Sequence, residues 1–304
     1  MTTPTPSNTS LTNFSDALAD AVETAAQAIV SVNGRQRLSS TGVLWRTGIV
    51  VAADHTIERE DELTVTLPDG TTSPATLVGR DPSTDLAVLR IDNTTAAPAQ
   101  IGDTSAVKVG HYVIALGRAG GTLSASGGVV SAIGNGRTGS GAQIDHLLRP
   151  DLTMYPGFSG GPLVDAQGRV VGITTSHLSR AGAVAIPTAT VNTVVDQLTT
   201  RGKIARGYLG ISMQPVRLPD AIKTALNLTA NGGLIVIAVE PGSPAEQGGL
   251  LIGDILISIE GSTLNDTSDV QALLGPDKVG TPVAIRVVRG GTDATVAVTV
   301  GERP

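Results

Sequence analysis

The chain has 304 residues, 40% of them hydrophobic and 2% aromatic, and its 21 basic and 27 acidic residues give a formal net charge of −6. This length predicts two domains or three, and the hydrophobic content excludes a largely disordered chain. The acidic balance and the scarcity of aromatic rings argue against nucleic acid as a partner, because they leave no basic face and no stacking platform.

Two further absences narrow the class of protein. The chain has no cysteine, which excludes disulfides, thiolate catalysis and cysteine-ligated metal sites. No apolar run approaches the roughly 18 residues that span a bilayer, so we expect no transmembrane segment. Residues 1–10 lack the basic and apolar regions of an export signal. The expected location is cytoplasmic by default, or periplasmic or extracellular if a signal was trimmed.

In chain order, residues 1–10 are rich in Thr, Pro, Ser and Asn and predict a disordered tail. Apolar residues then recur every three or four positions from Phe14 to Ile29, which predicts an amphipathic helix. From there to about Ile186, short Val, Ile and Leu runs alternate with Gly, Pro, Asp and Asn turns. This alternation predicts an all-β barrel or sandwich, followed by a helix over residues 188–200.

The remainder of the chain reads as a second domain. Residues 201–207 form a short polar, glycine-containing linker, and residues 208–304 mix predicted strands with two short helices, near 219–226 and 267–274. The predicted fold class is therefore mainly β, with a first domain over residues 11–200 and a second over 208–304.

The strongest chemical signal is a serine among glycines, in the segment Tyr155-Pro-Gly-Phe-Ser159-Gly-Gly-Pro-Leu-Val164. Glycines permit the sharp turn that would aim successive backbone N–H groups at one developing oxyanion. The alternative is an ordinary turn between two strands. A nucleophilic serine needs a base and an orienting carboxylate from distant positions, and these decide between the two interpretations.

Both partners are present upstream. His55 ends an apolar strand, and Asp85 directly precedes another. Alone, His55 could be a polar residue at a strand end, and Asp85 a turn or cap residue. The other histidines (His111, His146 and His177) lie in no paired context and show no metal-ligand spacing.

The order of His55, Asp85 and the serine segment resembles the HtrA-type (DegP- and DegS-like) branch of the chymotrypsin-fold serine proteases. Further matching segments are Ala115-Leu-Gly117, Gly127-Gly-Val-Val-Ser-Ala132, Gly168-Arg-Val-Val-Gly-Ile173 and Ala185-Ile-Pro187. The resemblance covers about residues 11–300, and it implies a double six-stranded β-barrel over residues 11–200, with the site in the cleft between the barrels.

By this resemblance, Ser159 is the nucleophile, His55 the general base, and Asp85 the carboxylate that orients the imidazole. The turn of Gly157, Phe158 and Ser159 would form the oxyanion hole, through the backbone N–H groups of Gly157 and Ser159. No cofactor and no metal ion are implied.

The pocket for the cleaved side chain (S1) follows more loosely from the same resemblance. Thr153 would lie at its base, and the segments Ile173–Ser176 and Ala183–Ile186, among them Thr174, Thr175 and Ala185, would line its edges. Because no acid lies at the base, we expect a small or medium aliphatic side chain rather than Arg or Lys.

Two residues of the serine segment depart from the family pattern. Where the family usually has Asn-Pro-Gly-Asn-Ser, this chain has Tyr155 and Phe158 in the asparagine positions. We expect the Phe158 ring to pack against a neighbouring loop, with Tyr155, and to bias the turn between two settings. The alternative is that the ring lines a wall of the substrate cleft.

The second domain resembles a PDZ domain, through Arg206-Gly-Tyr-Leu-Gly-Ile211 and the long Gly- and Ile-rich run from Glu240 to Gly261. The resemblance implies that the turn of Tyr208, Leu209, Gly210 and Ile211 presents N–H groups to a C-terminal carboxylate, while the strand edge accepts the peptide as an added strand. Leu209, Ile211 and Leu273 would line the apolar pocket.

Together, these features predict a serine endopeptidase of protein quality control that cleaves unfolded or misfolded polypeptides and binds C-termini at its PDZ domain. The first alternative is a catalytically silent peptide-binding scaffold or chaperone. A second is a hydrolase of esters or small amides. The family resemblance also implies a homo-oligomer, expected to be a trimer, against the alternative of a monomer whose N-terminal helix folds onto its own barrel.

Overall fold

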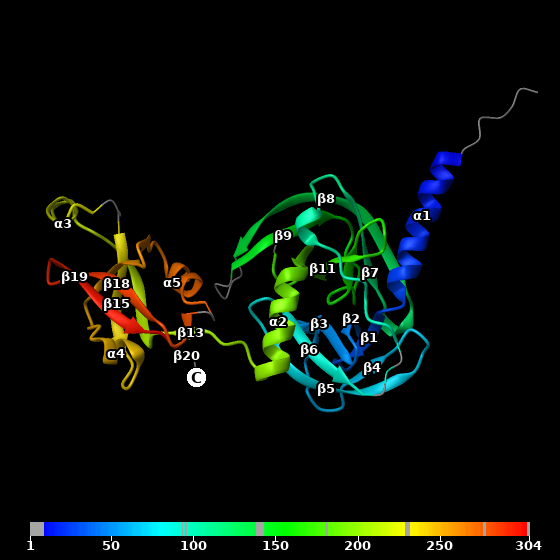
Figure 1. The fold of residues 1–304 in the computed structure, drawn as a ribbon, viewed down its shortest axis with the longest axis horizontal. Helices are drawn as coiled ribbons and strands as arrows, with labels where there is room; N and C mark the ends of the chain where they lie inside the picture. Colours follow the sequence, from blue (N-terminus) through cyan, green and yellow to red (C-terminus); the bar gives the residue numbers. More distant parts are fainter. Residues whose placement is uncertain are drawn as a thin grey trace, which may run out of the picture. The chain divides into compact units, whose positions relative to one another are not determined.

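The computed structural model describes residues 9–92, 94, 96–137, 143–179, 182–228, 232–275 and 278–302. The chain divides into two compact units, with the change from the first to the second between Lys203 and Ile204 (Figure 1). The predicted tail falls largely outside the described residues, but helix α1 (Thr9–Ala26) already includes its last two positions.

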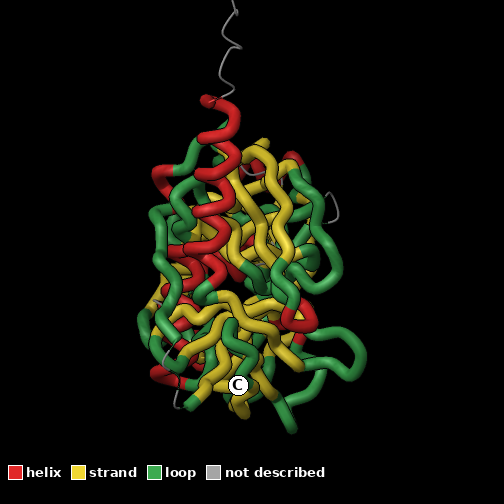
Figure 2. Tube along the Cα trace, turned by 90° about the vertical axis from the view of Figure 1, so that its right-hand side faces the viewer, coloured by secondary structure: helices red, strands yellow, loops and turns green. Residues whose placement is uncertain are grey.

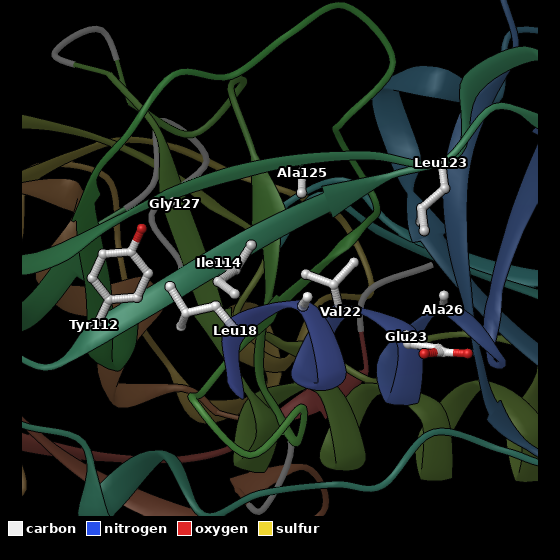
Figure 3. Close-up of a pocket in the computed structure, with 10 residues that line it drawn as sticks. Leu18, Val22, Glu23, Ala26, Tyr112, Ile114, Leu123, Ala125 and Gly127 are labelled. Atoms are coloured by element: carbon white, nitrogen blue, oxygen red, sulfur yellow. The ribbon is translucent and has the colours of Figure 1, made fainter. Parts of the chain in front are cut away.

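Helix α1 lies along the outside of the first unit, beside β7 (Tyr112–Gly117) and β8 (Ser124–Arg137) (Figures 1 and 2). Leu18 and Val22 point from the helix toward Tyr112 and Ile114 across an apolar groove of about 420 Å³ (Figure 3). The helix stops at Ala26, so Ile29, predicted on the same apolar face, begins the first strand instead.

The first unit contains two closed antiparallel barrels. One has the strand order β1-β2-β3-β6-β5-β4, and the other β10-β11-β12-β9-β8-β7. The strands of the first are β1 (Ile29–Asn33), β2 (Ser40–Arg46), β3 (Ile49–Ala53), β4 (Thr64–Thr66), β5 (Thr72–Asp81) and β6 (Leu86–Ile91). The second adds β9 (Gln143–Asp151), β10 (Pro162–Val164), β11 (Val170–Thr175) and β12 (Val184–Pro187) to β7 and β8.

Valine, isoleucine and leucine side chains fill the interior of both barrels, because every second side chain of a closed sheet points inward. The first barrel encloses a core that includes Val30, Leu44 and Leu89, and the second encloses one that includes Leu148 and Leu163. Helix α2 (Thr188–Arg201) packs against β11 and β5, and so contacts both barrels. The predicted double six-stranded barrel is confirmed.

The second unit contains a six-stranded antiparallel sheet, in which five strands follow the order β14-β15-β16-β18-β19, with β14 (Ile211–Arg217) at one edge. The other four strands in this order are β15 (Gly232–Val239), β16 (Ile255–Ile259), β18 (Pro282–Arg289) and β19 (Thr292–Thr299). Strand β13 (Gly207–Tyr208) pairs with β20 (Gly301–Glu302), and β17 (Ser262–Thr263) pairs with β16.

The two predicted helices of the second unit are present as α3 (Asp220–Ala225) and α5 (Thr267–Leu273). A third, α4 (Pro244–Gly248), was not predicted, although it has clear end signals. The Ser243 hydroxyl caps its start, and Gly249 ends it in the left-handed conformation. Across the described residues, no helix has the length and apolar character needed to cross a membrane.

Candidate active site

His55 and Asp85 lie side by side because β3 and β6 are neighbours in the first barrel. Ala53 at the end of β3 pairs with Leu86 at the start of β6, so the residues just beyond each strand end are adjacent. The backbone N–H of Asp54 donates to the Asp85 carbonyl at 3.0 Å, which fixes the two segments to one another. The sequence placed His55 after one predicted strand and Asp85 before another, and the pairing of these two strands brings the residues into contact.

The Asp85 carboxylate is buried and holds the imidazole directly. Its two oxygens lie 2.9 and 2.8 Å from His55 Nδ1, and one of them also accepts the His55 backbone N–H at 2.9 Å. The Thr175 hydroxyl donates to the other oxygen at 2.5 Å. A carboxylate only accepts hydrogen bonds, so this contact places a proton of His55 on Nδ1.

Ser159 lies in a cavity of about 290 Å³ that His55 and Ser176 also line. Its Oγ is 3.2 Å from Ser176 Oγ. Among the hydrogen bonds of the described residues, none joins Ser159 Oγ to His55. Nucleophile–base hydrogen bonds are often long in ligand-free sites and tighten when substrate binds.

The turn before Ser159 leaves two backbone N–H groups unused. Within the described part of the chain, no hydrogen bond uses the amide of Gly157 or Ser159, whereas the Phe158 N–H donates to the Tyr155 carbonyl at 3.1 Å. Gly157 has φ +87°, and a Cβ there would lie 2.5 Å from Ala119 Cβ, so no other residue fits without strain. Both amides predicted as oxyanion donors, those of Gly157 and Ser159, are therefore open to an acceptor.

The Phe158 ring is 2% exposed and lies in the core of the second barrel. It meets the Tyr155 ring edge to face, with centroids 5.5 Å apart and planes at 68°. The ring thus contacts Tyr155, as expected, but it packs in the barrel core rather than against a neighbouring loop. Its burial argues against the alternative in which it lines a wall of the cleft.

In the turn from Tyr208 to Ile211, which is predicted to bind a C-terminal carboxylate, two backbone carbonyls accept hydrogen bonds from within the second unit. Leu209 O accepts the Ala245 N–H and Gly210 O accepts the Glu240 N–H, both at 2.8 Å. Because N–H and C=O of a trans peptide point in opposite directions, the amides of Gly210 and Ile211 point the other way.

The side chains of this turn complete an edge site. Leu209 is buried in the core of the unit, with Ile211 and Leu273 packed against that core, and the Tyr208 hydroxyl donates to the Glu240 carboxylate. Helix α5 packs beside the edge strand β14. An extended peptide could therefore add to the sheet between this strand and this helix.

Two family models match the chain, one described as a trypsin-like peptidase domain over residues 40–173 and one as a PDZ domain over residues 207–300. A solved structure titled "HtrA-type protease AlgW with tripeptide" is 31% identical, with a TM-score of 0.74, and the match covers 94% of this chain and 97% of that chain. The chain belongs to the HtrA-type serine proteases.

Other HtrA-type relatives match over a similar range. The "serine endoprotease from Yersinia pestis" is 28% identical, with a TM-score of 0.75 over 94% of this chain and 98% of that chain. A "Probable periplasmic serine endoprotease DegP-like" from Halomonas elongata is 33% identical over 276 residues, or 89% of this chain. These residues are 57% of that relative, so the chain spans little more than half the length of the curated relatives it matches. The predicted family, with its PDZ domain, is confirmed.

Within this HtrA-type site, two residues lie against the predicted triad: Ser176, predicted only at an edge of the S1 pocket, and His177, for which no role was predicted. The His177 ring stacks on the His55 ring, with centroids 5.0 Å apart and planes at 16°. Ser176 is the residue whose hydroxyl approaches Ser159. The only available signal was their place directly after β11, the strand that ends at Thr175.

The structure corrects most of the predicted lining of the S1 pocket, although Ser176, at the end of the predicted edge, does line the cavity beside Ser159. Ile173, Thr174, Thr175 and Ala185 have no exposed surface, so they form no cleft wall in this structure. The hydroxyls of Thr174 and Thr175 are used internally, on the Phe158 and Gly161 carbonyls and on Asp85 respectively. Thr153 is exposed, but the cavity beside Ser159 is lined instead by Leu38, Met154, Tyr155 and Pro156, among others.

A second carboxylate, Asp54, directly precedes His55 in the chain. Burial raises the pKa of its carboxyl above the ordinary value, Arg80 at 3.4 Å opposes that rise, and the negative charges of Asp85 and Asp81 add to it.

The described residues contain no group of three or more His, Asp or Glu side chains arranged to hold a metal ion.

Proposed function

We propose that this chain is a serine endopeptidase that cleaves unfolded or misfolded polypeptides in protein quality control, with His55, Asp85 and Ser159 as its triad. The observation that carries the proposal is the buried Asp85 carboxylate held on His55 Nδ1, in the same cleft as a serine whose turn offers two free amides. The family of the chain supports the same chemistry, since its relatives are named as serine endoproteases.

In this mechanism, Ser159 Oγ attacks the carbonyl carbon of the scissile peptide bond while His55 Nε2 removes its proton. The carbonyl oxygen becomes an oxyanion and accepts hydrogen bonds from the Gly157 and Ser159 amides. His55 then returns the proton to the departing amine, which leaves an acyl-enzyme on Ser159. A water molecule repeats the sequence and frees the carboxylic acid product.

The electrostatic role of Asp85 follows from its burial and its partners. When His55 gains a proton, the imidazolium faces a carboxylate at 2.8 Å in a poorly solvated position, where the attraction is stronger than in water. Asp85 also keeps the Nδ1 proton in place, so that Nε2 stays free to act as the base.

The PDZ unit supports a polypeptide as substrate rather than a small ester. Its inward-paired carbonyls leave the Gly210 and Ile211 amides directed at an acceptor, and a C-terminal carboxylate is the charged acceptor that a peptide supplies. We propose that this site holds the C-terminus of a substrate or of an activating polypeptide. A scaffold without catalysis remains the alternative, because it would need only this second site.

The test replaces the proposed nucleophile. Ser159→Ala should abolish casein cleavage, with a loss on the order of 10⁶ in turnover, and should remove labelling by a fluorophosphonate. Ser131→Ala, in which an exposed serine on β8 is replaced, is the control and should keep both activities.

If the unaltered chain is not labelled at all, the scaffold alternative holds. If it is labelled and hydrolyses esters but leaves casein intact, it is an esterase. Cleavage near the original rate by Ser159→Ala would contradict the triad.

A further inference from the structure

Phe158 occupies the centre of the turn that carries Ser159, yet its ring points away from the substrate side. We propose that Phe158 is a positioning residue: its buried ring sets the Ser159 amide in the oxyanion-binding arrangement by fixing the two peptide planes that flank Phe158. This inference rests on the proposed function, because it concerns how the same site stabilises its transition state.

The ring is anchored in the second barrel. It is 2% exposed and packs in the core with Ala115, Leu163 and Val171. The space for it exists only because residue 117 is glycine, since a Cβ there would lie 2.7 Å from Phe158 Cε1. The backbone of the turn is therefore tied to the interior of a rigid barrel at its middle residue.

This anchor fixes the peptide plane that contains the Ser159 amide. The Phe158 carbonyl accepts hydrogen bonds from the Gly161 N–H at 2.9 Å and from Thr174 Oγ1 at 3.0 Å. The peptide bond is trans, so the Ser159 N–H must point away from Gly161 and Thr174. That direction leaves it open to an acceptor in the cavity that Ser159 lines.

The preceding peptide plane is held as well. The Gly157 carbonyl accepts the Thr41 hydroxyl at 2.6 Å, and the Phe158 N–H donates to the Tyr155 carbonyl at 3.1 Å. The Tyr155 ring rests against the Phe158 ring. To rotate either plane, the turn would have to break these hydrogen bonds and withdraw the ring from the core.

A residue that only filled the core would behave differently from a positioning residue. Loss of core packing lowers the fraction of folded protein, and this affects every substrate equally. Loss of oxyanion positioning affects only substrates that develop charge on oxygen. Sulfur is a weaker and larger acceptor, so a thiono ester profits little from the two amides. The ratio of kcat/KM for a peptide ester to that for its thiono ester therefore reports the oxyanion hole and not the folded fraction.

The experiment measures this oxygen-to-sulfur ratio in the full chain for four proteins: the unaltered chain, Phe158→Ala, Phe158→Leu and Leu89→Ala. Leu89→Ala is the matched control, because it empties part of the other barrel's core without touching the turn. We expect the ratio to fall about tenfold or more in Phe158→Ala, to recover largely in Phe158→Leu, and to stay unchanged in Leu89→Ala.

An unchanged ratio in Phe158→Ala would overturn the inference, even if the rates on both esters fell together. Gly117→Ala gives an independent arm, because its methyl group pushes against the ring and should lower the ratio in the same direction. A different result would contradict the proposed function itself: the unaltered chain would hydrolyse the oxygen ester no faster than the Ser159→Ala variant.

Discussion

Asp54 directly precedes His55 in the short helical turn after β3, and its carboxyl is largely buried. Burial raises the pKa of this carboxyl, the neighbouring charges of Asp85 and Asp81 raise it further, and Arg80 offsets part of the rise. A carboxyl with a raised pKa binds more protons in the folded state than in the unfolded state. Stability therefore falls as pH rises from the ordinary carboxyl range through the raised pKa.

Asp54→Asn removes this pH-dependent contribution to the free energy of unfolding. We expect the unfolding free energy of the variant, relative to the unaltered chain, to increase as pH rises from about 4 to 7. Denaturant titrations followed by Trp45 fluorescence measure it, because Trp45 is the single tryptophan and is buried in the first unit.

Asp69→Asn is the control for this prediction. The Thr71 amide lowers the pKa of the exposed Asp69 carboxyl, so its contribution has the opposite sign. The same pH trend in both variants would contradict the role assigned to burial at Asp54.

At the residue level, the sequence pointed to His55, Asp85 and Ser159, because each sits at a strand end or in a glycine turn. The structure places His55 against Asp85 and in one cavity with Ser159, and their catalytic roles stay a proposal. The sequence placed Ser176 at the S1 edge but missed its contact with Ser159, and it gave His177 no role. Their contacts with Ser159 and His55 depend on how the chain leaves β11, and no local pattern encodes that path. It also misjudged the S1 lining, since a residue's burial in a closed barrel depends on distant strands.

Among the elements, the short punctuated strands predicted β structure but left a barrel and a sandwich equally open. Closure depends on pairings such as β1 with β4, which join residues far apart in the chain. The resemblance to a known family, rather than periodicity, supplied the barrels. Helix α4 was missed because five residues are too few to show an apolar period.

An ion pair in the second unit joins strand β18 to the segment between α4 and β16. Arg289 on β18 donates to both oxygens of Asp254, at 2.8 and 2.7 Å, and to the Gly249 carbonyl at 2.7 Å. Asp254 is 1% exposed. Burial works against its charge, yet the hydrogen bonds from Arg289 and the Leu251 amide lower the pKa of the carboxyl overall. The pair thus holds the segment after α4 against the sheet.

Arg289→Ala should destabilise the second unit by about 2 kcal/mol, because it leaves a buried carboxylate without its main partner. Arg286→Ala is a matched control on the same strand, since its partner Asp293 is exposed and such pairs contribute about 0–1 kcal/mol. Hydrogen exchange of the β16 and β18 amides measures the effect in the full chain.

The pH dependence gives a second check on this ion pair. A lowered carboxyl pKa contributes stability above the ordinary value, and that stability is lost as pH falls through the lowered pKa. The difference between Arg289→Ala and the unaltered chain should therefore be full at pH 6 and shrink below about pH 4. Equal losses for both arginine variants would contradict the importance of burial here.

For the whole molecule, the proposed function gives the two units separate sites, one for cleavage and one for capture of a polypeptide end. Capture at the second site would raise the local concentration of the same polypeptide at the first, without any new contact at Ser159. A homo-oligomer, a trimer by family resemblance, stays a prediction. The exposure of Leu11 and Phe14 on α1, at 71% and 53%, supports self-association through that helix.

Capture can be tested without cleavage in the Ser159→Ala chain. A peptide that ends in a free carboxylate after Val, Leu or Ile should bind, and its C-terminal amide should bind at least about tenfold more weakly, because the Gly210 and Ile211 amides would lose a charged acceptor. Titration calorimetry measures both affinities.

Gly210→Ala should abolish the difference in affinity between the acid and the amide, since Gly210 has φ +78° and a Cβ there would overlap Ser243. In a chain that keeps Ser159, Gly210→Ala should leave fluorophosphonate labelling intact. Equal affinity of the unaltered turn for acid and amide would exclude this site as the carboxylate receptor.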